Sequence, residues 1–188
     1  MITSCCMRVS GLTKVHRHNE VLSALLSGVR CLGLNAVPSP PGYHPDSARN
    51  PDLLVSLPAG TMFCLDVSIV HPTAVSYLAA AGTHAGAACA RQEGVKVAKH
   101  EAAAKAHGHS FSPFVFETYG FCGEAAERFL KSVAVASHVP GAYRELRERV
   151  AVAVQRGNAL LARHGLELLK RAAVGAPSDA CALPGSGA

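Results

Sequence analysis

The sequence has no long apolar run. No stretch approaches the roughly 20 consecutive apolar residues that a helix needs to cross a bilayer. Residues 1–9 also lack the continuous apolar segment of a secretion signal. The seven cysteines are an odd number and lie scattered along the chain, which is typical of reduced thiols in an intracellular protein. We therefore expect an intracellular protein that is not secreted and has no membrane partner.

Several catalytic signatures are absent as well. There is no G-x-S-x-G nucleophile elbow, and no cysteine has an obvious histidine partner, which argues against a serine or cysteine hydrolase. No P-loop and no dinucleotide-binding glycine fingerprint occur. Aromatic residues make up only 5% of the chain, but 188 residues are enough to bury a core, so we expect one domain. The formal charge of +5 is a modest bias toward polyanions.

Residues 50–70 predict two neighbouring strands that carry acidic side chains. Residues 53–57 and 62–70 are short, apolar and rich in β-branched side chains, and a Pro-Ala-Gly turn separates them. Asp52 stands at the start of the first strand, and Asp66 lies within the second. Side-chain alternation puts Asp66 on the opposite side of its strand from the apolar residues that face the core.

These two acids are candidates for a metal site. An acid buried in a strand is costly unless it is paired, hydrogen-bonded or bound to a cation. Carboxylate oxygens suit Mg²⁺, which typically takes one or two carboxylates and keeps several waters. The alternative is that Asp52 caps a turn after Pro51 and that Asp66 lies on a solvated strand face. The residue pattern leaves both interpretations open.

Residues 91–107 predict a helix with a polar face. Glu93, Lys96, Lys99 and His100 recur at intervals of three and four, so they lie on one side of that helix. The lysines would supply positive charge to a site that the two acids form. The alternative is a solvated surface with ion pairs between successive turns.

The remaining segments complete an α/β pattern. Residues 74–90 have no strong period and predict a weak helix or an excursion. Helices are expected at 19–28 and 124–137, strands at 30–37 and 110–118, and a long helix or helix pair over 142–171.

The N-terminal region holds two cysteines and two histidines, which are Cys5, Cys6, His16 and His18. A zinc site needs two cysteines separated by two to four residues and a spaced histidine pair, and adjacent cysteines do not supply that spacing. The pattern therefore predicts at most a fragment of a zinc site, and it favours an unstructured N-terminus.

Five short motifs follow one another along the chain. They are Arg17-His18-Asn19, Pro51-Asp52, Leu65-Asp66-Val67-Ser68 with His71-Pro72, Glu93-x-x-Lys96-x-x-Lys99-His100, and Phe111-x-Pro113-Phe114-Val115-x-Glu117-x-Tyr119-Gly120. With the expected order of helix, three strands, helix and strand, they resemble the PD-(D/E)xK, or restriction-endonuclease-like, superfamily. Within it, the set is similar to the endonuclease domain at the C-terminal end of non-LTR retrotransposon reverse-transcriptase polyproteins. The resemblance covers roughly residues 16–136.

The resemblance implies a fold and a division of the chain. The fold would be α/β, with a restriction-endonuclease-like αβββαβ core, a mixed sheet flanked by helices, and extra C-terminal helices. A nuclease-like domain would span 19–137, after an N-terminal segment at 1–18 that includes disorder. A C-terminal helical extension at 138–172 and a disordered tail at 173–188 would follow.

The resemblance also implies roles for individual residues. Asp52 and Asp66 would be catalytic and would bind Mg²⁺ or Mn²⁺. The superfamily's usual lysine, two residues after the second acid, is replaced here by Ser68. Lys96 and Lys99 would supply the catalytic amine from the following helix instead. Accessory positions implied by the same motifs are Arg17, His18, Glu93, His100 and Glu117.

The implied function is hydrolysis of a DNA phosphodiester, which nicks a DNA target. The enzyme would be nuclear and derived from a retrotransposon. Its partners would be DNA, a second copy of the chain in a homodimer, and a reverse transcriptase encoded elsewhere, because the sequence itself holds no polymerase domain. One alternative is an inactive nuclease-fold module that binds DNA or is structural. The other is an unrelated α/β protein, for which the acids and lysines would not converge in space.

Overall fold

The chain folds into a four-stranded mixed sheet flanked by helices. The computed structural model describes residues 3–43, 50–58 and 60–174, with side chains described from residue 14 to residue 171 within those ranges. The elements in order are α1 (Thr3–Cys31), β1 (Asn35–Pro38), β2 (Leu53–Ser56), β3 (Met62–Val70), α2 (Leu78–Ala81), α3 (Ala87–Ala106), β4 (Ser110–Glu117), α4 (Glu124–Ser137) and α5 (Ala142–Val174). The expected α/β class is confirmed.

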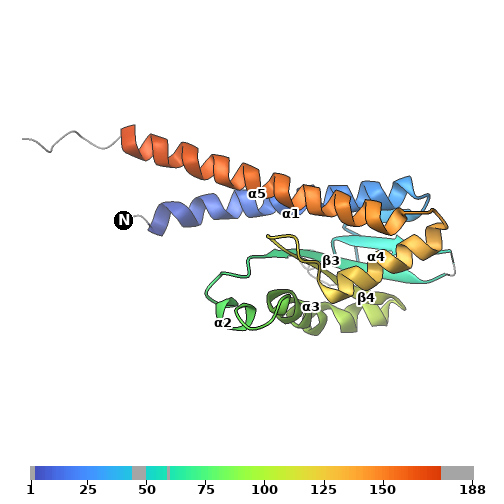
Figure 1. Ribbon diagram of the computed structural model, residues 1–188. Coiled ribbons are helices and arrows are strands. Elements are labelled where there is room, and N and C mark those ends of the chain that lie inside the picture. Colours follow the sequence, from blue (N-terminus) through green and yellow to red (C-terminus); the bar gives the residue numbers. More distant parts are fainter. Residues whose placement is uncertain (1–2, 44–49, 59, 175–188) are drawn as a thin grey trace, which may run out of the picture.

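The sheet has the strand order β1-β2-β3-β4. The first three strands are antiparallel neighbours, and β4 runs parallel to β3. Helix α3 makes the crossover between β3 and β4 and covers one face of the sheet. Helices α1, α4 and α5 lie on the other side, where α1 and α5 run alongside each other (Figure 1).

Strand β3 shows the alternation that the sequence predicts. Leu65 and Val67 are buried in the main core with side chains from α1, α4 and α5. Cys64 faces the other way and packs against Ala104 of α3. Asp66 pairs with a side chain of α3, so it lies on the same side of the sheet as Cys64. The tertiary structure therefore confirms the expected face of Asp66.

Helix α1 is longer than the sequence predicts. It begins at Thr3 and not at Asn19, so Asn19 lies within the helix and does not cap it. Val21, Leu25 and Val29 are buried at intervals of four, and Arg17 continues the same stripe. Since a charged residue occupies that buried position, the apolar pattern stops at Val21. The helix itself continues toward the N-terminus.

Two glycines allow α1 and α5 to pack closely. The sequence predicts Gly28 as a helix stop and Gly157 as a break, but both lie inside continuous helices. A Cβ atom on Gly28 would lie 2.6 Å from a side-chain carbon of Leu146, and one on Gly157 would lie 2.4 Å from Cγ of Arg17. The packing between the helices outweighs the intrinsic cost of glycine, which is about 1 kcal/mol per residue.

Helix α5 is part of the domain and not an extension of it. Leu146, Val150 and Val154 of α5 belong to the same buried core as the sheet and α1. The helix that the sequence assigns to a C-terminal extension after residue 138 thus packs into the same core as α1. Residues 175–188, where the sequence predicts a disordered tail, lie outside the described residues.

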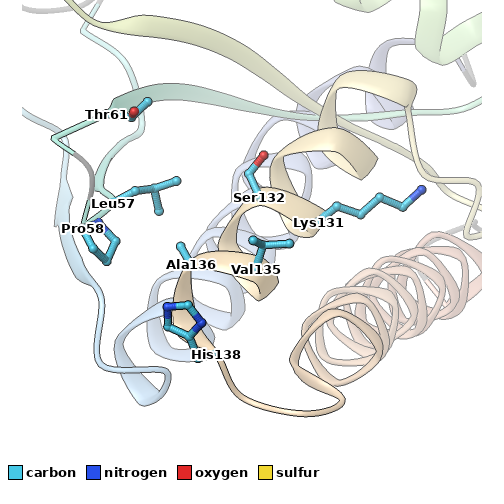
Figure 2. Close-up of a pocket in the computed structure, with 8 residues that line it drawn as sticks. All are labelled: Leu57, Pro58, Thr61, Lys131, Ser132, Val135, Ala136 and His138. Atoms are coloured by element: carbon cyan, nitrogen blue, oxygen red, sulfur yellow. The ribbon is translucent and has the colours of Figure 1, made fainter.

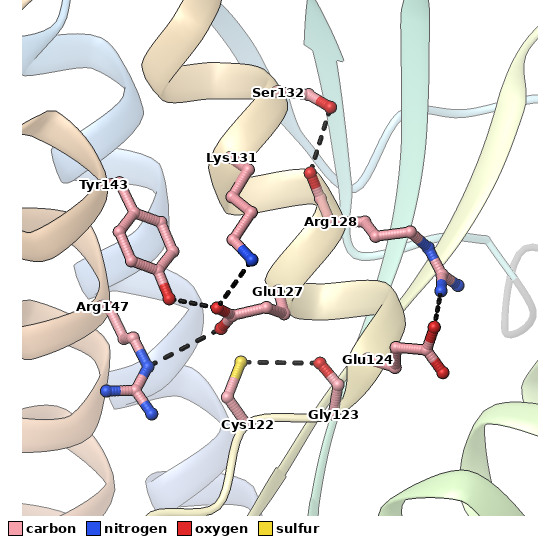
Figure 3. A network of polar contacts seen from close by, with 9 residues as sticks. All are labelled: Cys122, Gly123, Glu124, Glu127, Arg128, Lys131, Ser132, Tyr143 and Arg147. Carbon is pink, nitrogen blue, oxygen red and sulfur yellow. Dashed lines mark hydrogen bonds and ion pairs between the residues drawn. The ribbon is translucent and has the colours of Figure 1, made fainter.

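A polar cluster around Glu127 joins α4 to α5 (Figure 3). Glu127 accepts a hydrogen bond from the hydroxyl group of Tyr143, and its other carboxylate oxygen lies 3.6 Å from Nε of Arg147. Lys131 lies 3.4 Å from the same carboxylate. The Tyr143 hydroxyl holds the pKa of the Glu127 carboxyl below its usual range. The cluster thus fixes α4 and α5 to each other at their solvent-facing side.

Candidate functional site

A cavity of about 520 Å³ lies between α1, α3 and the end of β3. It contains both acids that the sequence singles out. Its lining residues are Lys14, Arg17, His18, Asp52, Asp66, Val67, Ser68, Ile69, Val70, His71, Ala74, Tyr77, Gln92 and Lys96.

Asp52 is held against β3 by hydrogen bonds. The antiparallel register pairs Leu53 with Leu65, which brings Asp52 opposite the next part of β3. The Asp52 amide donates to the Leu65 carbonyl at 2.9 Å, and Oδ2 of Asp52 accepts from the Val67 amide at 2.6 Å. The same oxygen lies 3.0 Å from Nε2 of His18. Asp52 therefore joins two strands and α1, and it is not a simple turn cap.

His18 is an imidazole held by a carboxylate. Its hydrogen bond to Asp52 is the main reason that the pKa of His18 is raised, while partial burial acts in the opposite direction. The Asp66 carboxylate adds to the increase through its charge. The protonated, positively charged form of His18 is favoured, and it orients Asp52 in the cavity.

This shift predicts a pH-dependent contribution to stability. The pKa of His18 is higher in the folded chain than its ordinary value of 6.5. Its contribution is therefore fully present below about pH 6.5 and is lost as pH rises through the raised pKa. We expect about 1 kcal/mol or less, because the side chains of His18 and Asp52 are 29% and 21% exposed.

Urea unfolding of the wild type and of His18→Gln, in EDTA across a pH series, measures this term. The two free energies of unfolding should differ most at the acid end and converge as pH rises. The exposed His164, replaced by Gln, is the matched control. A difference between wild type and His18→Gln that grows with rising pH would contradict the assignment.

Asp66 and Lys96 form an ion pair inside the cavity. Asp66 is only 7% exposed. Its Oδ2 atom pairs with Nζ of Lys96 from α3, and its Oδ1 atom lies 3.8 Å from Nε2 of His100. The His100 ring is buried and lies over Phe111, with 5.6 Å between ring centroids. The structure thus brings Asp52, Asp66 and Lys96 together, as the sequence predicts.

The residues of the expected polar face of α3 differ in position and in contacts. Lys99 is exposed and does not line the cavity, in contrast to Lys96. Glu93 turns toward α4, where Oε1 accepts a hydrogen bond from the Ala125 amide at 3.0 Å. Burial raises the pKa of the Glu93 carboxyl. Glu93 therefore caps the N-terminal turn of α4 and does not reach the cavity.

Glu117 also lies outside the cavity. It ends β4 opposite Val70 in the parallel register and is 7% exposed. Among the described residues, no hydrogen bond reaches its Oε1 atom. The structure therefore gives it a buried position at the sheet edge next to the cavity, without contact with Asp52 or Asp66.

The structure adds residues from α5 that the sequence does not indicate. Nη1 of Arg17 donates to Oδ1 of Asn158 at 2.9 Å. Nδ2 of Asn158 in turn donates to the carbonyl of Thr118 at 2.8 Å. Arg17 and Asn158 are 141 residues apart, so no local motif could have connected them. His71 belongs to the same region, with Nδ1 2.7 Å from the hydroxyl oxygen of Thr118.

The cavity carries more positive than negative charge. Lys14, Arg17 and Lys96 contribute cations, against the carboxylates of Asp52 and Asp66. The raised pKa of His18 increases the positive charge further. The cations of this lining suit an anionic ligand. The two carboxylates would hold a divalent cation beside that ligand.

The acids fit a hydrated divalent cation and do not fit a closed metal site. Within the described ranges, no group of three or more His, Cys, Asp or Glu side chains could hold a metal. Asp52 and Asp66 supply two carboxylates, and no hydrogen bond from a described residue reaches Oδ1 of Asp52. Mg²⁺ accepts such a set because it keeps several waters.

Among the described residues, no zinc site is found in the N-terminal region. Cys5 and Cys6 have side chains outside the described residues. His18 is bound to Asp52, and His16 is exposed on α1.

A second hollow of about 510 Å³ lies between the β2–β3 turn and the end of α4 (Figure 2). Its described lining is mostly apolar and contains no carboxylate, so it offers no oxygen cluster for a hard cation. The lining residues are Leu57, Pro58, Thr61, Lys131, Ser132, Val135, Ala136 and His138. The cavity that holds Asp52 and Asp66 is therefore the better candidate for chemistry.

The sequence matches no protein-family model and no curated protein. In the part of the chain that is described, no helix has both the length and the apolar character needed to cross a membrane.

Proposed function

We propose that this chain is a DNA endonuclease that depends on Mg²⁺ or Mn²⁺ and has its active site in the cavity that holds Asp52 and Asp66. The observation that carries the proposal is the meeting of Asp52, directly before β2, Asp66 of β3 and Lys96 of α3 in one cavity. The strand arrangement supports the proposal. Three antiparallel strands are followed by a helix and by a fourth strand parallel to the third, and this order is compatible with the restriction-endonuclease-like core that the motifs suggest.

The residues of the cavity have separate tasks. Asp52 and Asp66 would hold the cation, which when bound polarises a phosphate oxygen and lowers the pKa of an attacking water. His18 and the Val67 amide hold the Asp52 carboxylate in place. Lys96 keeps a positive charge beside Asp66, where it stabilises the negative charge that grows on the phosphate oxygens in the transition state.

The proposal extends to the origin and setting of the enzyme. The motif order supports derivation from a retrotransposon, action in the nucleus, and a reverse transcriptase supplied from elsewhere. The net charge of +5 and the basic cavity lining support a polyanionic substrate. A homodimer would allow two nicks at one target.

The test is a nicking assay on supercoiled plasmid. With Mg²⁺ or Mn²⁺, purified protein should convert the plasmid to the open circular form, and EDTA should stop the reaction. Equal cutting in EDTA would overturn the metal mechanism. A parallel gel-shift measurement detects DNA binding in the same samples.

A second candidate function is an inactive nuclease-fold module that binds DNA. The observation in its favour is that Ser68 replaces the usual lysine and Lys99 lies outside the cavity, so Lys96 is the one amine on α3 that lines it. This candidate predicts a gel shift without nicking at any divalent-cation concentration.

A further inference from the structure

Arg17 is the most unusual cation in the cavity. It lies on the buried stripe of α1, and its aliphatic stem packs over Gly157 of α5. Its side chain lines the cavity although the residue is only 9% exposed. The close approach of α5 at Gly157 and the hydrogen bond to Asn158 hold the side chain of Arg17 on both its stem and its guanidinium.

The guanidinium of Arg17 lacks the partner that its burial requires. Among the described residues, Nη1 donates to Asn158 while Nε has no hydrogen-bond partner. No carboxylate in the described part of the chain forms an ion pair with it. A buried guanidinium with five N–H donors is costly unless an anion or several acceptors satisfy it. Nothing else in the described ranges satisfies this group, which leaves it available to an anion that enters through the cavity.

Asn158 fixes the direction of the guanidinium. Its amide nitrogen donates to the Thr118 carbonyl, and this leaves its oxygen to face Arg17. Gln155 donates to the same carbonyl at 3.1 Å and supports this arrangement from the preceding turn of α5. The Thr118 carbonyl, directly after β4, thus orients Asn158, and Asn158 orients Arg17.

We propose that Arg17 binds a phosphate group of the nucleic-acid backbone in this cavity, and that Asn158 is its positioning residue. The inference rests on the proposed function for the identity of the substrate. Arginine suits this task because its planar fork makes two parallel hydrogen bonds to a phosphate. Lys14 and Lys96 flank the same cavity and add positive charge around the bound group.

The experiment measures binding without metal, so it is independent of cleavage. A short fluorescent DNA duplex is titrated with full-length protein in EDTA, with inorganic phosphate as a competitor. Arg17→Gln should weaken binding by about 10- to 100-fold, the range expected for losing charged hydrogen bonds. It should also reduce the slope of log Kd against log salt by about one. Arg156→Gln removes an equal charge from an exposed site on α5 outside this cavity and is the matched control.

Asn158→Asp keeps the inference testable if Arg17→Gln does not fold. The new carboxylate would pair with Arg17 but could no longer donate to the Thr118 carbonyl, so the midpoint of thermal unfolding should change little while DNA binding falls by about tenfold or more. A merely structural Asn158 would show unchanged binding. Equal affinities for Arg17→Gln and Arg156→Gln in folded protein, or wild-type affinity in Asn158→Asp, would overturn the inference. Binding that depends on Arg17 without any nicking would overturn only the proposed hydrolysis.

Discussion

Asp66→Asn is expected to lower the rate of metal-dependent nicking by about a thousandfold, the scale seen when one preorganised charged contact is lost from an active site. The substitution keeps the shape of the side chain but removes its charge. Asp66 is nearly buried and pairs with Lys96. No other acid of β3 can replace it, because Asp66 is the only acid in that strand. A single-turnover nicking assay with saturating Mg²⁺ measures the change.

The fold should survive this substitution. We expect a loss of about 1–3 kcal/mol in the free energy of unfolding, because the substitution breaks a largely buried ion pair with Lys96. Glu101→Gln is the matched control, since Glu101 is an exposed acid on α3 outside the cavity. Nicking by Asp66→Asn at the wild-type rate, with the protein folded, would remove the cavity from the mechanism.

Lys96→Met and Lys99→Met should differ in effect by about thirtyfold or more. Lys96 lines the cavity and contacts Asp66, so its loss should slow nicking by about 10²–10³-fold. Lys99 is exposed one turn away, and we expect a change of about threefold or less. The sequence motif assigns the same role to both lysines. A difference between the nicking rates of the two variants would therefore reflect their positions in the tertiary structure.

Single-turnover rates at several salt concentrations separate charge effects from chemistry. An exposed lysine that contacts DNA weakens binding in a salt-dependent way, whereas a lysine at the reacting phosphate lowers the rate at saturating DNA. Comparable losses of rate at saturation in both variants would contradict the assignment of Lys96 alone. A wild-type rate in Lys96→Met would contradict the role of the helix amine altogether.

Strong local periodicity made parts of the fold predictable. Strand β3 (Met62–Val70) and helix α4 (Glu124–Ser137) have the bounds that the sequence predicts. In β3 the alternation separates Leu65 from Asp66, and in α4 the buried residues Ala126, Phe129, Leu130 and Val133 recur at three and four. Each of these patterns depends only on neighbouring residues, so it can be recognised without knowing the rest of the chain.

Other features were mispredicted because distant contacts override local propensity. Gly28 does not end α1, since its missing side chain admits Leu146 of α5. Arg17 does not lie ahead of the first helix, where the expected helix at 19–28 leaves it, but within α1, where Asn158 binds it. Glu93 was an accessory candidate for the site, but it caps α4 because that helix begins beside it.

The sequence by itself determined which residues could carry the chemistry: two acids on neighbouring strands and a polar helix after them. Strand alternation placed Asp66 opposite the apolar core residues of its strand, because successive side chains point to opposite faces, but it left open whether that side lines a cavity or meets water. Only the tertiary structure decided which lysine meets that acid, and that Asn158 of α5 binds Arg17 beside the cavity. The reason is that helix rotation and helix–helix packing depend on contacts between residues far apart in the chain, and no local pattern contains that information.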